Sequence, residues 1–340
     1  MKREELTALL TDLCSAPGIS GDEDAAARIA LAALRVHCPD AHISHGNVTG
    51  TLGSTRTDAP HILLDAHIDQ VGLIVTSVTE DGFVTVGNIG GLDRRILPDQ
   101  MVCIHGRKAV PGVISCMPPH LTDGEESVPK IEDFRIDTGY PAGALREIVS
   151  PGDSVTFTGV TGLLPGGRFT SPALDDRCGV AAILYALDLV RGEALPCRIT
   201  VLFSTQEEVG ERGAAIGCFA ADPDQALAVD VSFAGNGERS ESGVMGKGPM
   251  IGFSPSLSRR VSRALCDAAD ADGIPWQYEV MAGTTGTNAD RFSVCRSGVS
   301  ACTVSIPLDY MHTPAEVIAI EDVEQTGRLL AGYVRRCGVC

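Results

Sequence analysis

The chain has 340 residues, of which 44 % are hydrophobic and 4 % aromatic, so its core must be built mainly from aliphatic side chains. This length exceeds the usual range of one domain, and we expect either two domains or one large domain with an insertion. The formal net charge of −17 excludes binding to nucleic acid, whose phosphates would be repelled, and favours partners that carry positive charge.

The cysteines and the apolar runs predict a cytoplasmic protein with reduced thiols. The twelve cysteines are scattered, and Met1–Leu6 lacks the apolar core of a secretory leader. No stretch approaches the roughly 18 apolar residues that span a bilayer, so we expect no membrane partner.

The first 70 residues read as helices followed by short strands. Leucines at helical spacing predict a helix over residues 3–14, and Ser20 and Glu23 have the spacing of a capping box that would open a helix through Leu34. Strands are expected around 41–44, 48–52 and 61–66.

The third of these strands ends in His67-Ile-Asp69, a pattern with two interpretations. A histidine that binds a metal needs its other ring nitrogen held, commonly by a carboxylate, and Asp69 is close enough in sequence to do this. Taken alone, the pattern also fits a core histidine followed by a local Asp turn.

Residues 71–162 have a different character from the rest of the chain. Short alternating runs, broken by Gly, Pro and Asp, predict strands near 71–78, 83–88, 101–105, 110–117 and 154–158. Long amphipathic helices are missing from this pattern. We therefore predict a small β-barrel inserted into an α/β domain that comprises 1–70 and 163–340.

Two acidic pairs follow the insertion. Asp175 and Asp176 precede an apolar helix over 180–190, where a single Asp would suffice as an N-cap. Glu207 and Glu208 follow an apolar strand over 199–203. A charged first turn of a helix would explain this second pair equally well.

Two further polar residues interrupt apolar strands or follow them. Asp230 lies within a predicted strand over 226–232, and His312 follows one over 303–306. A buried Asp needs a partner. The remaining predicted elements are a Gly/Ala-rich helix from about Gly213, a turn at 246–249, a helix over 258–271, a strand over 276–280, a loop over 283–289 and a final helix from about 320.

Together these positions predict a metal centre at one rim of an α/β sheet, where the carboxyl ends of buried strands bind ligands. The candidates are His67, Asp175, Glu207, Glu208, Asp230 and His312. Nitrogen and oxygen ligands suit Zn²⁺, Co²⁺ or Mn²⁺, and six candidates exceed the needs of one ion. A two-metal hydrolytic centre would use them all, with one Glu as ligand and the other as general base.

Five stretches resemble the M42 family of metallo-aminopeptidases, which includes glutamyl aminopeptidases and TET peptidases and some members labelled endoglucanase M. They are HIDQVG (67–72), PALDDRCG (172–179), STQEEVGERGA (204–214), ALAVDV (226–231) and IPLDYMHTPAEV (306–317). Their order and the insertion between the first two agree with that family, and Pro118-Pro-His120 extends the resemblance into the insertion.

The resemblance implies an α/β/α sandwich peptidase domain, similar to other zinc peptidases, with a PDZ-like inserted barrel that serves dimerisation. It implies two divalent ions, Zn²⁺ first and Co²⁺ or Mn²⁺ as alternatives. His67, Asp175 and Asp230 would hold one ion, and Asp175, Glu208 and His312 the other.

The same resemblance assigns further roles. Glu207 would be the general base, Asp69 would orient His67, and the Asp175–Asp176 peptide would be cis. The expected substrates are peptides with a free N-terminus, and the expected assembly is a homo-oligomer, from dimer to dodecamer.

Three residues depart from the family pattern without removing a ligand or the base. Gln70 stands where Glu is usual, Asn288 where Asp is usual, and Asp309 where Arg is frequent. We therefore do not carry the family's substrate preference over. The Asp309 change weakens the case for an enzyme specialised on acidic residues.

Three other functions stay open at this stage. A different metal-dependent amidase or deacylase would use the same centre. A glycoside hydrolase needs two carboxylates without metal and normally aromatic platforms, which a chain with one Trp lacks. The three departures also leave room for a non-catalytic scaffold.

Overall fold

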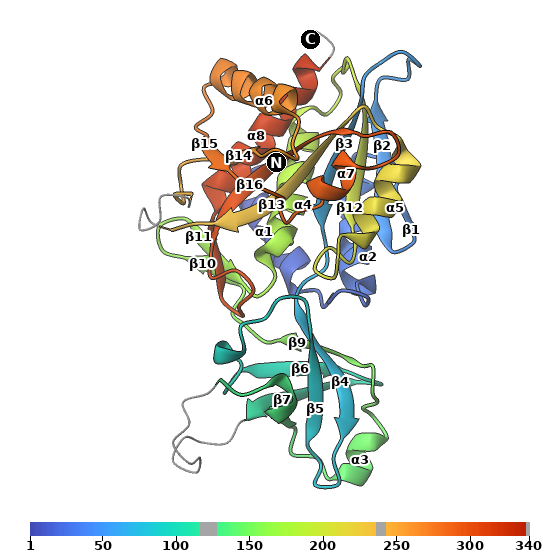
Figure 1. Cartoon of the computed structure of the whole chain (residues 1–340), viewed down its shortest axis with the longest axis vertical. Helices are drawn as coiled ribbons and strands as arrows, with labels where there is room; N and C mark the ends of the chain where they lie inside the picture. Colours follow the sequence, from blue (N-terminus) through green and yellow to red (C-terminus); the bar gives the residue numbers. More distant parts are fainter. Residues whose placement is uncertain (116–127, 236–242, 338–340) are drawn as a thin grey trace.

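The computed structural model describes residues 1–115, 128–235 and 243–337. These residues form a mixed α/β body and a small closed β-barrel at one end of the molecule (Figure 1). Among the helices of these ranges, none has both the length and the apolar character that a bilayer span requires. Pro118-Pro-His120 lies outside the described residues.

One mixed sheet of eleven strands, counted over the described residues, runs through the body. In order across the sheet these are β1 (His42–Ser44), β2 (Asn47–Gly53), β12 (Arg198–Ser204), β3 (His61–His67), β13 (Gln225–Phe233), β16 (Ser300–Asp309), β17 (Glu316–Ala319), β11 (Arg168–Ser171) and β10 (Gly162–Leu164), with β14 (Met250–Phe253) beside β16 and β15 (Gln277–Val280) beside β14. The central strands β12, β3, β13 and β16 pair in parallel, so their carboxyl ends share one edge.

Helices cover both faces of this sheet (Figure 1). One face carries α1 (Arg3–Ser15), α2 (Asp24–Leu34), α4 (Leu174–Leu189), α6 (Arg259–Asp272) and α8 (Ile320–Arg336), and the other carries α5 (Arg212–Ala221) and α7 (Ala289–Ser293). Side chains alternate between the two cores: Ile62 and Leu64 of β3 pack with the first group, and Leu63 packs with the second. This arrangement confirms the predicted α/β/α sandwich.

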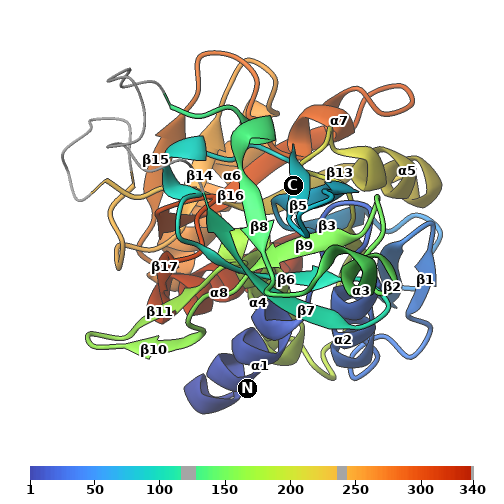
Figure 2. The ribbon, with the colours of Figure 1, turned by 90° about the horizontal axis from the view of Figure 1, so that it is seen from below.

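The inserted barrel is confirmed as well. Its strands close in the order β4 (Gly72–Val78), β5 (Val84–Ile89), β8 (Arg135–Asp137), β7 (Ala109–Ser115), β6 (Met101–His105) and β9 (Ser154–Phe157), with short helical turns at Arg94–Ile96, Ile131–Asp133 and α3 (Ala142–Arg146). Alternate residues such as Val110, Gly112 and Ile114 of β7 are buried in a separate small core. Figure 2 shows the barrel in front of the α/β body, seen from the barrel end.

The sequence predicted the longer elements and some short strands, such as β1 and β15, but missed other short ones. Strands β8, β10, β11, β14 and β17 have three or four residues each, in which a period is hard to recognise. The predicted strand over 303–306 is longer than expected and runs over Ser300–Asp309.

The capping-box interpretation of Ser20 was wrong. Helix α2 begins only at Asp24, and Glu23 precedes it without a side-chain cap. The Ser20 hydroxyl instead donates to Asp69 Oδ2 at 2.6 Å. Ser20 therefore takes part in a contact between segments that are 49 residues apart, and not in a helix cap.

Candidate metal centre

The parallel strands deliver the predicted site residues to one edge of the sheet. His67 ends β3 in register with Ser204, the last residue of β12, and the Glu207–Glu208 pair follows shortly after. Asp230 lies in β13, Asp175 opens α4, and His312 follows β16. The peptide between Asp175 and Asp176 is cis, as the resemblance implied.

Ligand atoms from these residues converge in two groups that share one carboxylate. His67, Asp175 and Asp230 form one group, and Asp175, Glu208 and His312 form the other, with the ligand atoms of each group within 4.8 Å of one another. His67, Glu207 and Glu208 form a third combination.

Asp175 lies between the two histidines. Its Oδ1 is 3.1 Å from His67 Nε2, and its Oδ2 is 3.2 Å from His312 Nε2. Glu208 Oε1 lies 3.2 Å from His312 Nε2, and Asp230 Oδ1 lies 3.9 Å from His67 Nε2. A carboxylate with each oxygen facing a different histidine has the geometry of a bridging ligand.

The site has more negative than positive charge. Burial and the surrounding carboxylates raise the pKa of Asp230 and of Glu208, and they raise the pKa of Glu207 to about 9. Burial lowers the pKa of His312, but the nearby carboxylates of Asp175 and Glu208 outweigh this and raise that pKa to about 11. Buried carboxylates that outnumber their imidazole partners favour any added cation.

This donor set fits two divalent cations. The oxygen and nitrogen ligands suit Zn²⁺, Co²⁺ or Mn²⁺, and Asp175 can serve both ions. Glu208 Oε1 is buried without a hydrogen bond of good geometry in the described structure, as expected of an atom placed for a metal.

Asp69 supports the site in two ways. Its backbone carbonyl oxygen lies 3.1 Å from His67 Nδ1, and its carboxylate Oδ1 lies 3.6 Å from the same nitrogen. The carboxylate also accepts the backbone N–H of Glu207 at 3.0 Å and of Glu208 at 3.2 Å. Asp69 therefore fixes the Glu pair as well as the histidine.

His312 is oriented by the inserted barrel. Its Nδ1 lies 2.7 Å from the carbonyl oxygen of Gly91, so that Nδ1 carries the proton and Nε2 faces Asp175 and Glu208. The preceding Gly90 has φ +75°, and a Cβ there would lie 2.7 Å from Val71 Cγ1 and 3.3 Å from Glu208 Cβ. A glycine is needed for this close approach.

Sequence reasoning missed Glu316, a buried carboxylate that joins the two halves of the site. It accepts the backbone N–H groups of Leu174 at 2.7 Å, Asp175 at 3.1 Å and His312 at 2.9 Å. Burial and the nearby Asp175 raise its pKa to about 8. Its place four residues after His312 was the available signal, but we assigned that segment to a connection before the last helix.

The three departures lie behind or beside the centre. Gln70 Oε1 accepts from Arg177 Nη2 at 3.0 Å, and Asn288 Nδ2 donates to Asp65 Oδ2 at 2.7 Å and to Ser204 Oγ at 2.9 Å. Asp309 ends β16 and is not among the residues that line the cavity over the metal ligands.

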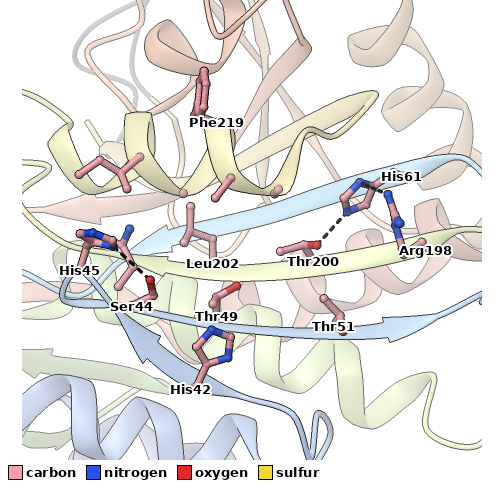
Figure 3. A pocket seen from close by; sticks show the side chains of 15 residues that line it. His42, Ser44, His45, Thr49, Thr51, His61, Arg198, Thr200, Leu202 and Phe219 are labelled. Atoms are coloured by element: carbon pink, nitrogen blue, oxygen red, sulfur yellow. Dashed lines mark hydrogen bonds between the residues drawn. The ribbon is translucent and has the colours of Figure 1, made fainter.

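A second cavity, of about 570 Å³, lies between α5 and the strands β1, β2 and β12 (Figure 3). Within it Arg198 Nη2 donates to His61 Nδ1 at 2.8 Å, and the protonated Nε2 of His61 donates to Thr200 Oγ1 at 2.8 Å. Burial and Arg198 lower the pKa of His61. No carboxylate is among the described residues that line it, so it does not resemble a hydrolytic metal centre.

Comparison with known proteins agrees with this geometry. The family model described as M42 glutamyl aminopeptidase matches residues 46–329. Lysyl aminopeptidase from Pyrococcus furiosus is 30 % identical, over 94 % of this chain and 94 % of its own length.

Two solved structures are similar over nearly the whole chain. An aminopeptidase from the archaeon Desulfurococcus kamchatkensis has a TM-score of 0.92 at 30 % identity, covering 98 % of this chain and 95 % of that one. The TET1 peptidase of Pyrococcus horikoshii, which can assemble into a tetrahedron or a large octahedral shell, has a TM-score of 0.86 at 29 % identity, covering 97 % and 99 %.

Proposed function

Because this chain belongs to the M42 glutamyl aminopeptidase family, and is thereby an aminopeptidase that hydrolyses peptide bonds, we propose that it acts through two divalent cations and a glutamate base. The observation that carries the proposal is the pair of ligand groups that share Asp175, with its two oxygens directed at His67 and His312. This arrangement uses five ligands and leaves Glu207 free to move protons.

Bound by these residues, Zn²⁺, Co²⁺ or Mn²⁺ ions supply Lewis acidity to the scissile carbonyl and to the attacking water. Glu207 lines the same cavity and belongs to neither of the two ligand groups that share Asp175. With cations offsetting the surrounding negative charge, its carboxylate would be ionised, take the proton of the attacking water and return it to the leaving amine. The backbone N–H contact to Asp69 holds Glu207 in place for both transfers.

The negative charge of the site would also favour binding of the N-terminal end of a peptide substrate. A free N-terminal ammonium group complements the carboxylates around the cavity, whereas an acetylated N-terminus loses that attraction. We therefore expect peptides with a free N-terminus as substrates.

Assembly is the second part of the proposal. We assign the inserted barrel, with the chain divided at 70/71 and 162/163, to contacts between subunits of a homo-oligomer. Exposed apolar side chains within residues 71–162 support this: Met101 of β6 is 51 % exposed and Val160 is 74 % exposed. TET1 of Pyrococcus horikoshii is similar in structure and assembles into closed shells. Size-exclusion chromatography with light scattering measures the oligomeric state, and a Val160→Asp variant should shift it towards smaller species.

The catalytic proposal is tested with metal-free protein refilled with each cation. Activity on aminoacyl-p-nitroanilides is compared with activity on their N-acetylated forms, and bound metal is counted in parallel. Glu207→Gln should bind two ions and lose turnover, whereas its neighbour Glu208→Gln should bind fewer ions.

Two results would contradict the proposal. Full activity of Glu207→Gln would exclude it as the base, and equal cleavage of the acetylated substrates would indicate a general amidase or deacylase.

A further inference from the structure

The cavity over the metal ligands has a volume of about 270 Å³ and is also lined by residues that the catalytic proposal does not use. These residues come from the ends of β13 and β15 and from the loops before α7 and after β16, among them Ser232, Phe233, Glu279, Thr285, Thr287 and Met311. A substrate held with its scissile bond at the ligands would direct its first side chain into such a space.

Glu279 gives this pocket a charged end. Its Oε2 accepts from Ser305 Oγ at 2.7 Å, and Ser305 is the register partner of Asp230 on the neighbouring parallel strand. Adjacent strands lie about 4.8 Å apart, so the carboxylate of Glu279 is near the metal ligands but separate from them. Glu279 is 8 % exposed, and burial raises its pKa while the hydroxyls of Ser232 and Ser305 oppose the shift.

No cation of the described chain pairs with this carboxylate. Over residues 1–115, 128–235 and 243–337, the ion pairs within 4 Å do not include Glu279, and its pKa shift has no contribution from Lys, Arg or His. Buried carboxylates are normally paired. A cationic ligand in the cavity would supply the partner that the described residues do not.

The walls of the pocket fit a long aliphatic side chain. Phe233, which is 60 % exposed at the end of β13, and Met311 both line the cavity. The loop at Thr285 is fixed by Asp290, which accepts the backbone N–H of Thr285 at 2.8 Å and of Gly286 at 3.0 Å. Lys and Arg place their stems along apolar surface and their charged ends in polar surroundings.

We propose that this aminopeptidase prefers peptides that begin with lysine or arginine, and that Glu279 binds the cationic end of that first side chain. The inference rests on the proposed function, since it takes the metal centre to hold the scissile bond. An acidic first residue would bring its carboxylate against Glu279 and is disfavoured.

The test compares kcat/KM for Lys-, Arg-, Leu- and Glu-p-nitroanilide in the metal-loaded enzyme and in Glu279→Gln. We expect Lys and Arg substrates to lead by at least about tenfold in the parent enzyme. The variant should lose about tenfold or more on Lys, mainly through KM, and stay within about threefold on Leu. Asp309→Asn, a buried carboxylate change outside the cavity, is the matched control and should leave the Lys/Leu ratio unchanged.

A competition measurement gives a second readout. Free lysine should inhibit Leu-p-nitroanilide cleavage more strongly than norleucine, which has the same stem length without the charge, and Glu279→Gln should remove the difference. A parent enzyme that cleaves Leu at least as well as Lys, or an unchanged ratio in Glu279→Gln, would overturn the inference alone. Absence of cleavage of every free-amine substrate with every metal would overturn the proposed function instead.

Discussion

Arg177 offers the sharpest test of how the metal centre is held in place. It is fully buried, and its side chain has five N–H donors. Each is directed at a neutral acceptor: Nε donates to Ile68 O at 3.1 Å, and Nη1 and Nη2 donate to Leu13 O at 2.7 Å, Ala16 O, Gly18 O at 3.4 Å and Gln70 Oε1 at 3.0 Å. These acceptors belong to the end of α1 and to the segment that carries Asp69.

We expect Arg177→Met to destabilise the fold strongly. Hydrogen bonds to a charged group contribute about 1.5–3 kcal/mol each, but methionine also removes the desolvation cost of the guanidinium. Leaving a buried acceptor without a donor costs about 1–3 kcal/mol, and for these acceptors together we expect a net loss of about 4 kcal/mol. Arg177→Lys keeps the charge with three donors and should lose about half of that.

Urea unfolding of the metal-free protein measures both values, with the fluorescence of Trp276, the one tryptophan of the chain, as the signal. Arg56→Met is the control, because the Arg56 side chain is exposed and forms its ion pair and hydrogen bonds with the nearby Asp58, so the unfolding midpoint should not move. A loss below about 1 kcal/mol in Arg177→Met would refute the reasoning that these carbonyls depend on the guanidinium.

Three further predictions concern the charged groups around the centre. Since Asp175 belongs to both ligand groups, Asp175→Asn should bind neither metal ion while His312→Ala keeps one, as metal analysis of the purified variants would show. Burial raises the pKa of Glu23 to about 7, so the free energy of unfolding falls as the pH rises from about 4.5 to 7. Glu23→Gln should remove up to about 3 kcal/mol of that fall. Urea unfolding at several pH values measures it, and the same pH dependence in both proteins would contradict the prediction. Asn288→Asp replaces the amide that donates to Asp65 by a second carboxyl group, and two adjacent carboxyl groups are stable when one proton is shared between them. The variant should therefore lose more stability at pH 8 than at pH 5.5. A loss of stability that does not depend on pH would contradict this.

The sequence was sufficient to predict which residues would bind metal, but not which residues fix those ligands in place. His67, Glu208 and Asp230 could be placed because each belongs to an apolar parallel strand or follows one, and such strands end at a common edge. Local pattern and topology together were enough to predict that these side chains meet.

The supporting contacts could not be predicted in this way. Glu316 holds the backbone of Asp175 across 141 residues, and Ser20 donates to Asp69 across 49. Such pairs leave no periodic trace, and Ser20 carried a misleading local signal because its spacing to Glu23 imitates a cap. Glu279 was missed for a related reason: its strand looked ordinary, and only the fold brings its carboxylate to the cavity.

The contact between His312 and Gly91 changes how the insertion should be understood. A barrel that served assembly alone would need no contact with the ligands, yet the turn after β5 supplies the carbonyl that fixes the His312 tautomer. Gly90 lies against Glu208, so a ligand of the second group meets the same turn. The second ion would then be bound only when barrel and α/β body are correctly joined. Because assembly contacts on the barrel would act on this turn, subunit association and the affinity for the second ion are expected to be coupled.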